Sequence, residues 1–225
     1  MSISREAVRV VRGDQHLSDW LSLGSRPVPW RNMASSNEVE IKFKVSDIDD
    51  LAARLRRLGL EHITPRTHEM NTLFDLPGQP LAKRGDLLRL RKYGEIWVLT
   101  HKSKSPENGG AHKTRVEIET RVENGEKTEA ILRALGFEPC FRYEKFRAEW
   151  KGGKGYVVID ETPIGNFAEI EGQPQWIDDV ARDLEVDRKQ YITETYPGLF
   201  AAWKGRSASD ASEMTFEAIE AAGRR

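Results

Sequence analysis

Glu38-Val39-Glu40-Ile41-Lys42-Phe43-Lys44-Val45 places charged and apolar residues in strict alternation. Because successive side chains of a β-strand point to opposite faces, this segment predicts a strand with one charged and one apolar face. The charged face carries two carboxylates, which are hard oxygen ligands, and two lysines, which attract phosphate oxygens. Such a face suits a divalent metal bound to a polyphosphate, and it equally suits a solvated outer face. The same alternation recurs along the chain, which favours the functional interpretation.

The composition describes a globular chain with a modest core. Of the 225 residues, 38% are hydrophobic and 32% are charged, and the mean hydropathy is −0.61, which allows one large domain or two small ones. The net charge of −1 provides no global basic field for nucleic acid. Cys140 is the sole cysteine, so no intramolecular disulfide can form, and a reducing compartment such as the cytoplasm is expected. No apolar run approaches the ~20 residues that span a membrane, so no membrane association is expected.

The two ends of the chain differ from its middle. Residues 1–35 contain no signal-peptide apolar region and are expected to form a poorly ordered N-terminal extension. Met33 stands just before the first predicted strand, so residues 1–32 are either an upstream extension or the product of a mis-called start. Residues 204–225 are expected to form a polar, solvated C-terminal tail with a short helix around Glu213–Ala222. The structured domain is therefore expected to span residues 36–203.

An internal repeat is visible within this domain. Val39-Glu40-Ile41 has a counterpart in Val116-Glu117-Ile118. The same offset aligns Val45 with Val122 and Leu58-Gly59 with Leu135-Gly136. Each copy predicts a strand and then a helix, roughly Asp47–Leu58 and Glu126–Leu135, which ends at a glycine. We interpret the core as two related halves.

Six further segments show a charged and an apolar face. They are Leu87–Lys92, Trp97–Lys104, Thr114–Val122, Tyr143–Trp150, Tyr156–Glu161 and Phe167–Glu171. Amphipathic helices, including a third at about Gln175–Leu184, can cover the apolar faces. Two arrangements fit: an open sheet with a solvated charged face, or a closed barrel with a charged lumen. Periodicity alone favours the open sheet.

The order of these motifs resembles the CYTH superfamily, the triphosphate tunnel metalloenzymes. Glu38-x-Glu40-x-Lys42 looks like the signature of that family. The matching segments that follow are Leu88-Arg89-Leu90-Arg91, Leu99-Thr100-His101-Lys102, Arg115-x-Glu117-x-Glu119, Lys145-x-Arg147, Asp160 and Gly165-x-Phe167-x-Glu169-x-Glu171. The resemblance covers about Glu38 to Phe200. It implies an α+β fold, a closed eight-stranded antiparallel β-barrel with a charged lumen and helices packed outside.

The resemblance also implies a metal-dependent reaction on a linear triphosphate. The acidic side would hold Mg²⁺ or Mn²⁺ through Glu38, Glu40, Asp160, Glu169 and Glu171. The basic side would bind the substrate through Lys42, Arg89, Arg91, Lys102, Arg115, Lys145 and Arg147. Glu38, Glu40 and Lys42 are the expected catalytic residues. This division is physically reasonable, because arginine forks bind phosphate oxygens in pairs and a metal bridges neighbouring phosphates.

Other polar and aromatic residues have smaller expected roles. Glu117 and Glu119 are expected to orient basic side chains through ion pairs. His101 falls on the face opposite Lys102 and is expected to be structural or exposed, and His112 is expected to be an exposed loop residue. The tryptophans expected to pack under helices are Trp97, Trp150 and Trp176.

Within the family, the chain looks most like the class IV adenylyl cyclase subgroup. Thr195-Tyr196-Pro197-Gly198-Leu199-Phe200 resembles that subgroup's Ser-Tyr-x-x-Leu-Leu ending, with departures at Thr195 and Pro197. The resemblance implies conversion of ATP to cyclic AMP and pyrophosphate, with a thiamine or inorganic triphosphatase as the alternative. A non-catalytic polyphosphate binder is disfavoured, because its carboxylates would repel a polyanion without metal. The expected partner is thus ATP, thiamine triphosphate or inorganic triphosphate, with homodimerisation possible and no nucleic acid bound.

Overall fold

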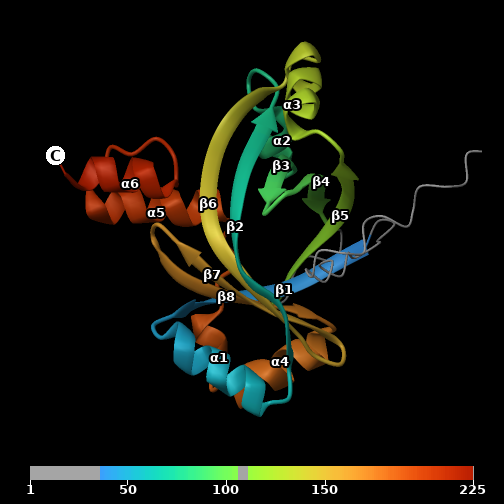
Figure 1. Cartoon of the computed structure of the whole chain (residues 1–225), viewed down its shortest axis with the longest axis vertical. Helices are drawn as coiled ribbons and strands as arrows, with labels where there is room; N and C mark the ends of the chain where they lie inside the picture. Colours follow the sequence, from blue (N-terminus) through green and yellow to red (C-terminus); the bar gives the residue numbers. More distant parts are fainter. Residues whose placement is uncertain (1–35, 106–110, 225) are drawn as a thin grey trace, which may run out of the picture. The chain divides into compact units, whose positions relative to one another are not determined.

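The structure, a computed structural model, describes residues 36–105 and 111–224 (Figure 1). The predicted N-terminal extension lies outside the described residues. The strands are β1 (Ser36–Val45), β2 (Glu61–Asp75), β3 (Leu87–Tyr93), β4 (Ile96–Lys104), β5 (Lys113–Val122), β6 (Glu138–Lys151), β7 (Gly155–Thr162) and β8 (Gly165–Gly172). The helices are α1 (Ile48–Arg57), α2 (Pro80–Arg84), α3 (Gly125–Ala134), α4 (Pro174–Asp183), the 3-10 turn η1 (Arg188–Gln190), α5 (Tyr196–Ser207) and α6 (Phe216–Gly223).

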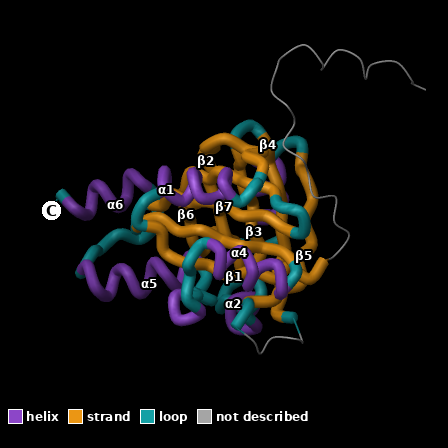
Figure 2. The backbone as a smooth tube through the Cα atoms, turned by 90° about the horizontal axis from the view of Figure 1, so that it is seen from below, coloured by secondary structure: helices purple, strands orange, loops and turns teal. Residues whose placement is uncertain are grey.

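The eight strands form a closed barrel in the order β1-β5-β4-β3-β2-β6-β7-β8. Every neighbouring pair is antiparallel, and β1 closes the barrel because it pairs with both β5 and β8. Glu40, for example, lies opposite Lys113 on one side and Glu171 on the other. In Figure 2 the strands occupy the centre and the helices lie around them. The open sheet that periodicity alone favours is therefore wrong, and the barrel implied by the family resemblance is confirmed.

β2 is the strand for which the sequence analysis named no range. Its fifteen residues pair with β3 and β6, but the ladder with β6 shifts register between His62 and Thr64 and again between Thr64 and Thr67. Pro65 lies within this irregular stretch. Because a bulge moves the following side chains to the other face, the alternation that revealed the other strands is interrupted here.

Helices α1 and α3 begin and end as their sequences predict. The side chains of Asp47 and Asn124 accept hydrogen bonds from the backbone of the first turn. Gly59 and Gly136 follow the helices with φ of +79° and +88°, a conformation that glycine adopts without strain. In each case the next residue donates back to the last turn, as in a Schellman motif. The predicted glycine caps are confirmed.

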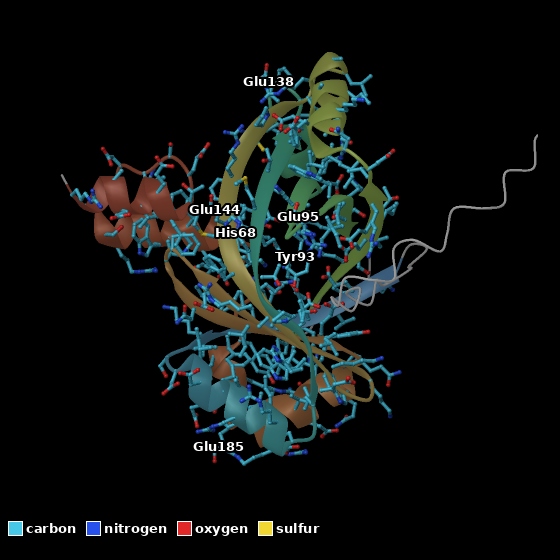
Figure 3. All side chains as sticks on the ribbon, viewed as in Figure 1. His68, Tyr93, Glu95, Glu138, Glu144 and Glu185 are labelled. Atoms are coloured by element: carbon cyan, nitrogen blue, oxygen red, sulfur yellow. The ribbon has the colours of Figure 1, made fainter. Side chains whose placement is uncertain are left out.

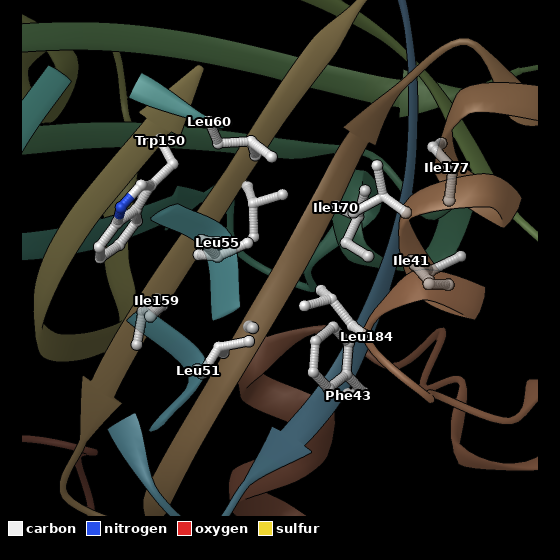
Figure 4. Close-up of a cluster of buried hydrophobic side chains, with 14 of the residues drawn as sticks. Ile41, Phe43, Leu51, Leu55, Leu60, Trp150, Ile159, Ile170, Ile177 and Leu184 are labelled. Carbon is white, nitrogen blue, oxygen red and sulfur yellow. The ribbon is translucent and has the colours of Figure 1, made fainter. Parts of the chain in front are cut away.

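The main core lies between the outer face of the barrel and helices α1 and α4 (Figure 4). The outward-facing Ile41 and Phe43 of β1 are buried there together with Leu55 and Ile177 from the helices. Trp150 is buried in the same cluster, with Trp176 packed against it, while Trp97 packs against the smaller cluster near α3, as expected for packing residues. None of the helices in residues 36–105 and 111–224 is long and apolar enough to cross a bilayer.

The C-terminal residues differ from the expected solvated tail. Met214 is 0% exposed, and its backbone forms hydrogen bonds with Arg142 and Glu144 of β6. Phe216, the first residue of α6, packs on Phe146 with 5.5 Å between ring centroids. β7 pairs with β6 only from Phe146 onwards, so the first half of β6 presents an edge that this segment covers. Apolar residues such as Met214 and Phe216, which cover this edge, are few and widely spaced, so the sequence did not predict that the segment packs on the barrel.

Candidate active site in the barrel interior

The interior of the barrel is lined by charged side chains from all eight strands: the seven that the sequence predicted, and β2. These inward-facing residues are Glu38, Glu40, Lys42, Glu69, Arg89, Arg91, Lys102, Lys113, Arg115, Glu117, Glu119, Lys145, Arg147, Asp160, Glu169 and Glu171. The strand alternation places them on one face, and the closure of the barrel brings them together. Because buried charges are costly unless paired, most of them form ion pairs with one another.

The acidic side forms where β1 lies beside β8. Glu40 lies opposite Glu171 in the ladder, and Lys42 lies opposite Glu169. Glu38 accepts from Lys102 Nζ at 2.5 Å, and Glu40 accepts from Lys113 Nζ at 2.5 Å. The predicted metal ligands Glu38, Glu40, Glu169 and Glu171 thus lie on two adjacent strands.

A second group of ion pairs joins β1, β6, β7 and β8. Arg147 donates to Asp160 Oδ1 at 2.7 Å and to Glu169 Oε2 at 2.6 Å, and Lys42 Nζ lies 3.2 Å from Glu169 Oε1. Burial alone would raise the pKa of Glu169, but the attraction of Lys42 and Arg147 outweighs it and holds that pKa well below its usual range. Burial likewise opposes the charge of Lys42, whose pKa is nevertheless raised by Glu169 and Glu40.

The basic side extends across β3, β4 and β5. Arg91 donates to Glu119 Oε2 at 3.0 Å, and Lys102 Nζ lies 3.3 Å from Glu117 Oε1. Arg89 lies 3.7 Å from the same Oε2 atom of Glu119. Glu117 and Glu119 therefore pair with the basic side chains, as their expected orienting role requires. Arg115 shares their face and lies opposite Glu38 in the ladder.

Asp160 and His112 differ from simple expectations. Asp160 is fully buried, and Lys145, Arg147 and Tyr196 all donate to its carboxylate. His112 Nε2 lies 2.9 Å from Asp178 Oδ1 of α4, so this side chain connects the start of β5 to a helix outside the barrel instead of lying exposed.

Several interior residues lie outside the set that the sequence motifs predicted. Glu69 is 0% exposed; it accepts from Asn71 Nδ2 at 2.9 Å and lies 3.4 Å from Lys145 Nζ and 3.6 Å from Arg91 Nη1. Both Glu69 and Asn71 belong to β2, for which no range was predicted. The spacing Glu69-x-Asn71-x-Leu73 was the available signal, since these residues share the inner face. Lys113 was missed because the predicted strand began one residue later.

The strand registers place Tyr93 on the inner face of the barrel and His68 and Glu144 on the outer face; all three are labelled in Figure 3. Tyr93 donates from its hydroxyl to Glu149 Oε1 at 3.3 Å, and both residues belong to the inner face. Burial and the nearby Glu149 raise the pKa of Tyr93 far above its usual value, so it remains a hydrogen-bond donor. His68 and Glu144 pair on the outer face, with 3.7 Å between Nε2 and Oε2.

The carboxylates of the acidic side are of the ligand type that Mg²⁺ and Mn²⁺ prefer. Carboxylates directly opposite each other on neighbouring strands repel, and Glu40 and Glu171 form such a pair. No group of three or more potential ligands occurs among the described residues. Mg²⁺ is commonly held by one or two carboxylates together with waters and substrate phosphates, so a full protein cage is not required. Glu40 and Glu171 would hold the ion, and Glu38 and Glu169 flank them.

The paired interior carboxylates predict a loss of stability in acid. The pKa values of Glu69, Glu119 and Glu169 are lowered in the folded state, so their charge stabilises the fold fully above the unfolded-state pKa of about 4.3. This contribution is lost as the pH falls through the lower folded-state values. We expect the free energy of unfolding, measured with urea, to change little from pH 7 to pH 5 and to fall steeply below about pH 4. A flat profile down to pH 3 would contradict the assignment.

Known proteins share both this sequence pattern and this fold. The CYTH domain model matches residues 36–196. "Putative adenylate cyclase MJ0240" of Methanocaldococcus jannaschii is 30% identical over 149 residues, which cover 66% of this chain and 83% of that protein. Adenylate cyclase CyaB of Aeromonas hydrophila is 27% identical over 174 residues, covering 71% of this chain and 86% of CyaB.

Two solved structures show the same fold. A "putative adenylate cyclase" of Vibrio parahaemolyticus superposes with a TM-score of 0.65 at 19% identity, covering 75% of this chain and 99% of that one. HpAC1 of Hippeastrum, described as having a dominant triphosphatase activity, superposes with a TM-score of 0.55 at 19% identity and covers 75% and 96% of the two chains. The charged barrel and the matched sequence agree, and the chain belongs to the CYTH family.

Proposed function

We propose that this protein is a metal-dependent enzyme acting on a triphosphate-bearing substrate inside the barrel, and that the substrate is ATP. The observation that carries this proposal is the division of one enclosed interior into an acidic side, on β1 and β8, and a basic side, on β3, β4, β5 and β6. A polyphosphate needs the cations, and the carboxylates need a metal if a polyanion is to lie beside them. Ion pairs such as Lys102 with Glu38 and Arg147 with Glu169 join the two sides.

The basic residues would bind and orient the phosphates. Arg89, Arg91 and Arg147 offer forked donors, while Lys42, Lys102 and Lys145 act as point charges. A bound triphosphate would exchange their carboxylate partners for phosphate oxygens. Mg²⁺ or Mn²⁺ held by Glu40 and Glu171 would supply charge neutralisation at the phosphates. The three donors on Asp160 favour a positioning role for this carboxylate over the metal ligation that its motif implies.

In the proposed cyclase reaction, the ribose 3′-oxygen forms a bond to the α-phosphorus of ATP. The bond from that phosphorus to the oxygen bridging to the β-phosphate breaks, pyrophosphate leaves, and the hydroxyl proton is released. The interior would contribute mainly by orienting the reacting groups and stabilising the developing charge. The similarity to CyaB and MJ0240 supports this choice.

A triphosphatase is the second candidate. The dominant triphosphatase activity described for HpAC1 indicates that this fold accommodates water as the nucleophile, and a fold by itself does not specify the reaction. The charge pattern of the interior suits both reactions, since each requires the same triphosphate to be bound. The presence of the interior carboxylates makes a purely non-catalytic binder the least favoured alternative.

Product analysis distinguishes these functions. Purified protein would be incubated with Mg²⁺ or Mn²⁺ and, in parallel, with ATP, inorganic triphosphate or thiamine triphosphate. We expect cyclic AMP and pyrophosphate from ATP, and none without added metal. Orthophosphate released mainly from inorganic or thiamine triphosphate would replace the cyclase with a triphosphatase. Binding of triphosphate without turnover of any substrate would contradict both enzymatic functions.

A further inference from the structure

Tyr196, the first residue of α5, reaches the charged interior from outside the eight strands. Its hydroxyl donates to Asp160 Oδ2 at 2.6 Å. Lys42 Nζ and Lys145 Nζ lie 4.4 Å and 4.8 Å from the centroid of its ring. These three partners come from β1, β6 and β7, so a single side chain contacts two of the three predicted phosphate-binding lysines and also Asp160.

The ring of Tyr196 is held rigidly by an apolar cluster. It stacks on Tyr143 at 5.5 Å between centroids and meets the ring of Phe167 edge-on at 6.0 Å. Tyr143 and Phe167 share the inner faces of their strands with the charged residues, so this cluster forms an apolar layer next to the site. Phe200 of α5 belongs to the same cluster. The ring contacts with Tyr143 and Phe167 therefore help to fix the position of Tyr196.

The residues before Tyr196 also contact Lys42. Ile192 N donates to Lys42 O at 2.7 Å, and Lys42 Nζ donates to Glu194 O at 3.2 Å. Lys42 is thus fixed at its backbone, at its ammonium group and by the ring of Tyr196. Residues 192–196 lie after the last barrel strand, yet they determine where this lysine points.

We propose that Tyr196 is a positioning residue of the phosphate-binding site: its ring and hydroxyl hold Lys42, Lys145 and Asp160 in the arrangement that receives the triphosphate. This inference rests on the proposed function. The two ammonium groups lie 4.4 Å and 4.8 Å from the Tyr196 ring centroid, and the ring together with Asp160 offsets the repulsion between the two positive charges. The hydroxyl also donates a hydrogen bond to Asp160 Oδ2 and partly neutralises its charge. Without this hydrogen bond, Asp160 would attract Lys145 and Arg147 more strongly and would compete with phosphate for these two cations.

Four variants test this role. Tyr196→Phe removes only the hydroxyl, and Tyr196→Leu removes the ring as well. Tyr191→Phe is the matched control for the first, because the Tyr191 hydroxyl also bonds to an aspartate, Asp178, outside the barrel. Phe200→Leu is the control for the second, because Phe200 belongs to the same apolar cluster and its ring packs on Phe141, which is uncharged. Binding of inorganic triphosphate would be measured by calorimetry, alongside kcat, KM and the melting temperature.

We expect Tyr196→Phe to weaken triphosphate binding about tenfold, the effect of losing one hydrogen bond to a charged group. Tyr196→Leu should weaken it about a hundredfold, since the cation–π contacts are lost too. Both controls should bind within about twofold of wild type, and Phe200→Leu should lower only the melting temperature. Tyr196→Phe retains the shape of the ring and should stay folded, so it remains informative if the leucine variant does not.

Unchanged triphosphate binding by Tyr196→Phe and Tyr196→Leu would overturn the inference while leaving the proposed function intact. A loss no greater than that of the matched controls would also overturn it, because the effect would then be structural. Wild-type protein that neither binds nor converts any triphosphate would overturn the proposed function, and the inference would fall with it.

Discussion

Glu40→Gln is expected to abolish metal-dependent turnover, with a loss in kcat on the order of a thousandfold, while the barrel remains folded. Glutamine keeps the size of the side chain but is neutral, so it cannot hold a divalent cation in partnership with Glu171 across the ladder. Its cationic partner, Lys113, would lose an ion pair near the edge of the interior. The Lys113 side chain is partly exposed, so water can solvate the released ammonium group, and the cost to stability should be small.

The measurement is turnover of the preferred triphosphate at increasing Mg²⁺ or Mn²⁺, with the melting temperature as a check on folding. Glu161→Gln is the control, because Glu161 lies on the outer face of β7 and pairs with Arg66 at 2.7 Å. It removes the same charge from the same barrel and should leave turnover within about twofold of wild type. Wild-type activity in Glu40→Gln would remove this residue from the proposed metal site.

The strands with strict alternation were predictable because the residue type at each position indicates on which face of the strand the side chain lies. β1 and β3 each present charged residues on one side and apolar residues on the other, and the structure places them accordingly. Closure of the barrel was not predictable from periodicity, because an open sheet with a solvated face produces the same pattern. It depends on pairing between β1 and β8, strands far apart in the chain, and only the family resemblance indicated it.

The composition of the site was predictable, but its pairing was not. The motif residues Glu38, Lys42 and Arg147 all lie in the interior, and the sign of each charge follows directly from the residue type. Which carboxylate contacts which cation depends on strand register and barrel curvature, which alternation does not report. Tyr196 shows a second limit: it follows the last strand by more than twenty residues, and only packing of α5 brings it to Asp160.

Glu69→Gln should have the largest effect on stability, lowering the free energy of unfolding by about 3 kcal/mol at pH 7. Glu69 is fully buried, and Lys145, Arg91 and Arg147 lie within 4.0 Å of its carboxylate. Removing one member of a buried ion pair costs about 3–5 kcal/mol, because the opposite charge is left uncompensated. We expect the lower end here, since each of the three cations keeps a second carboxylate: Asp160 for Lys145 and Arg147, and Glu119 for Arg91.

Urea unfolding at pH 7 and pH 3, with Glu161→Gln as the surface control, measures this effect. Burial would raise the pKa of Glu69, but Lys145, Arg91 and Arg147 outweigh it and hold that pKa far below its usual range. The stability that the ionised Glu69 carboxylate contributes is therefore complete above about pH 4.3 and decreases as the pH falls below that value. The difference in the free energy of unfolding between wild type and Glu69→Gln should accordingly be smaller at pH 3 than at pH 7.

Inorganic triphosphate provides an independent check on the same charge balance. Without the Glu69 carboxylate the interior is more positive and should bind metal-free triphosphate more tightly. A ligand that binds the folded state more tightly stabilises it more, so triphosphate should raise the melting temperature of Glu69→Gln by more than that of wild type. Equal stability of the two proteins at pH 7 would mean that Glu69 is already neutral in the fold. In that case the arginines and lysines of the basic side would be balanced by the remaining carboxylates alone, and triphosphate should stabilise both proteins equally.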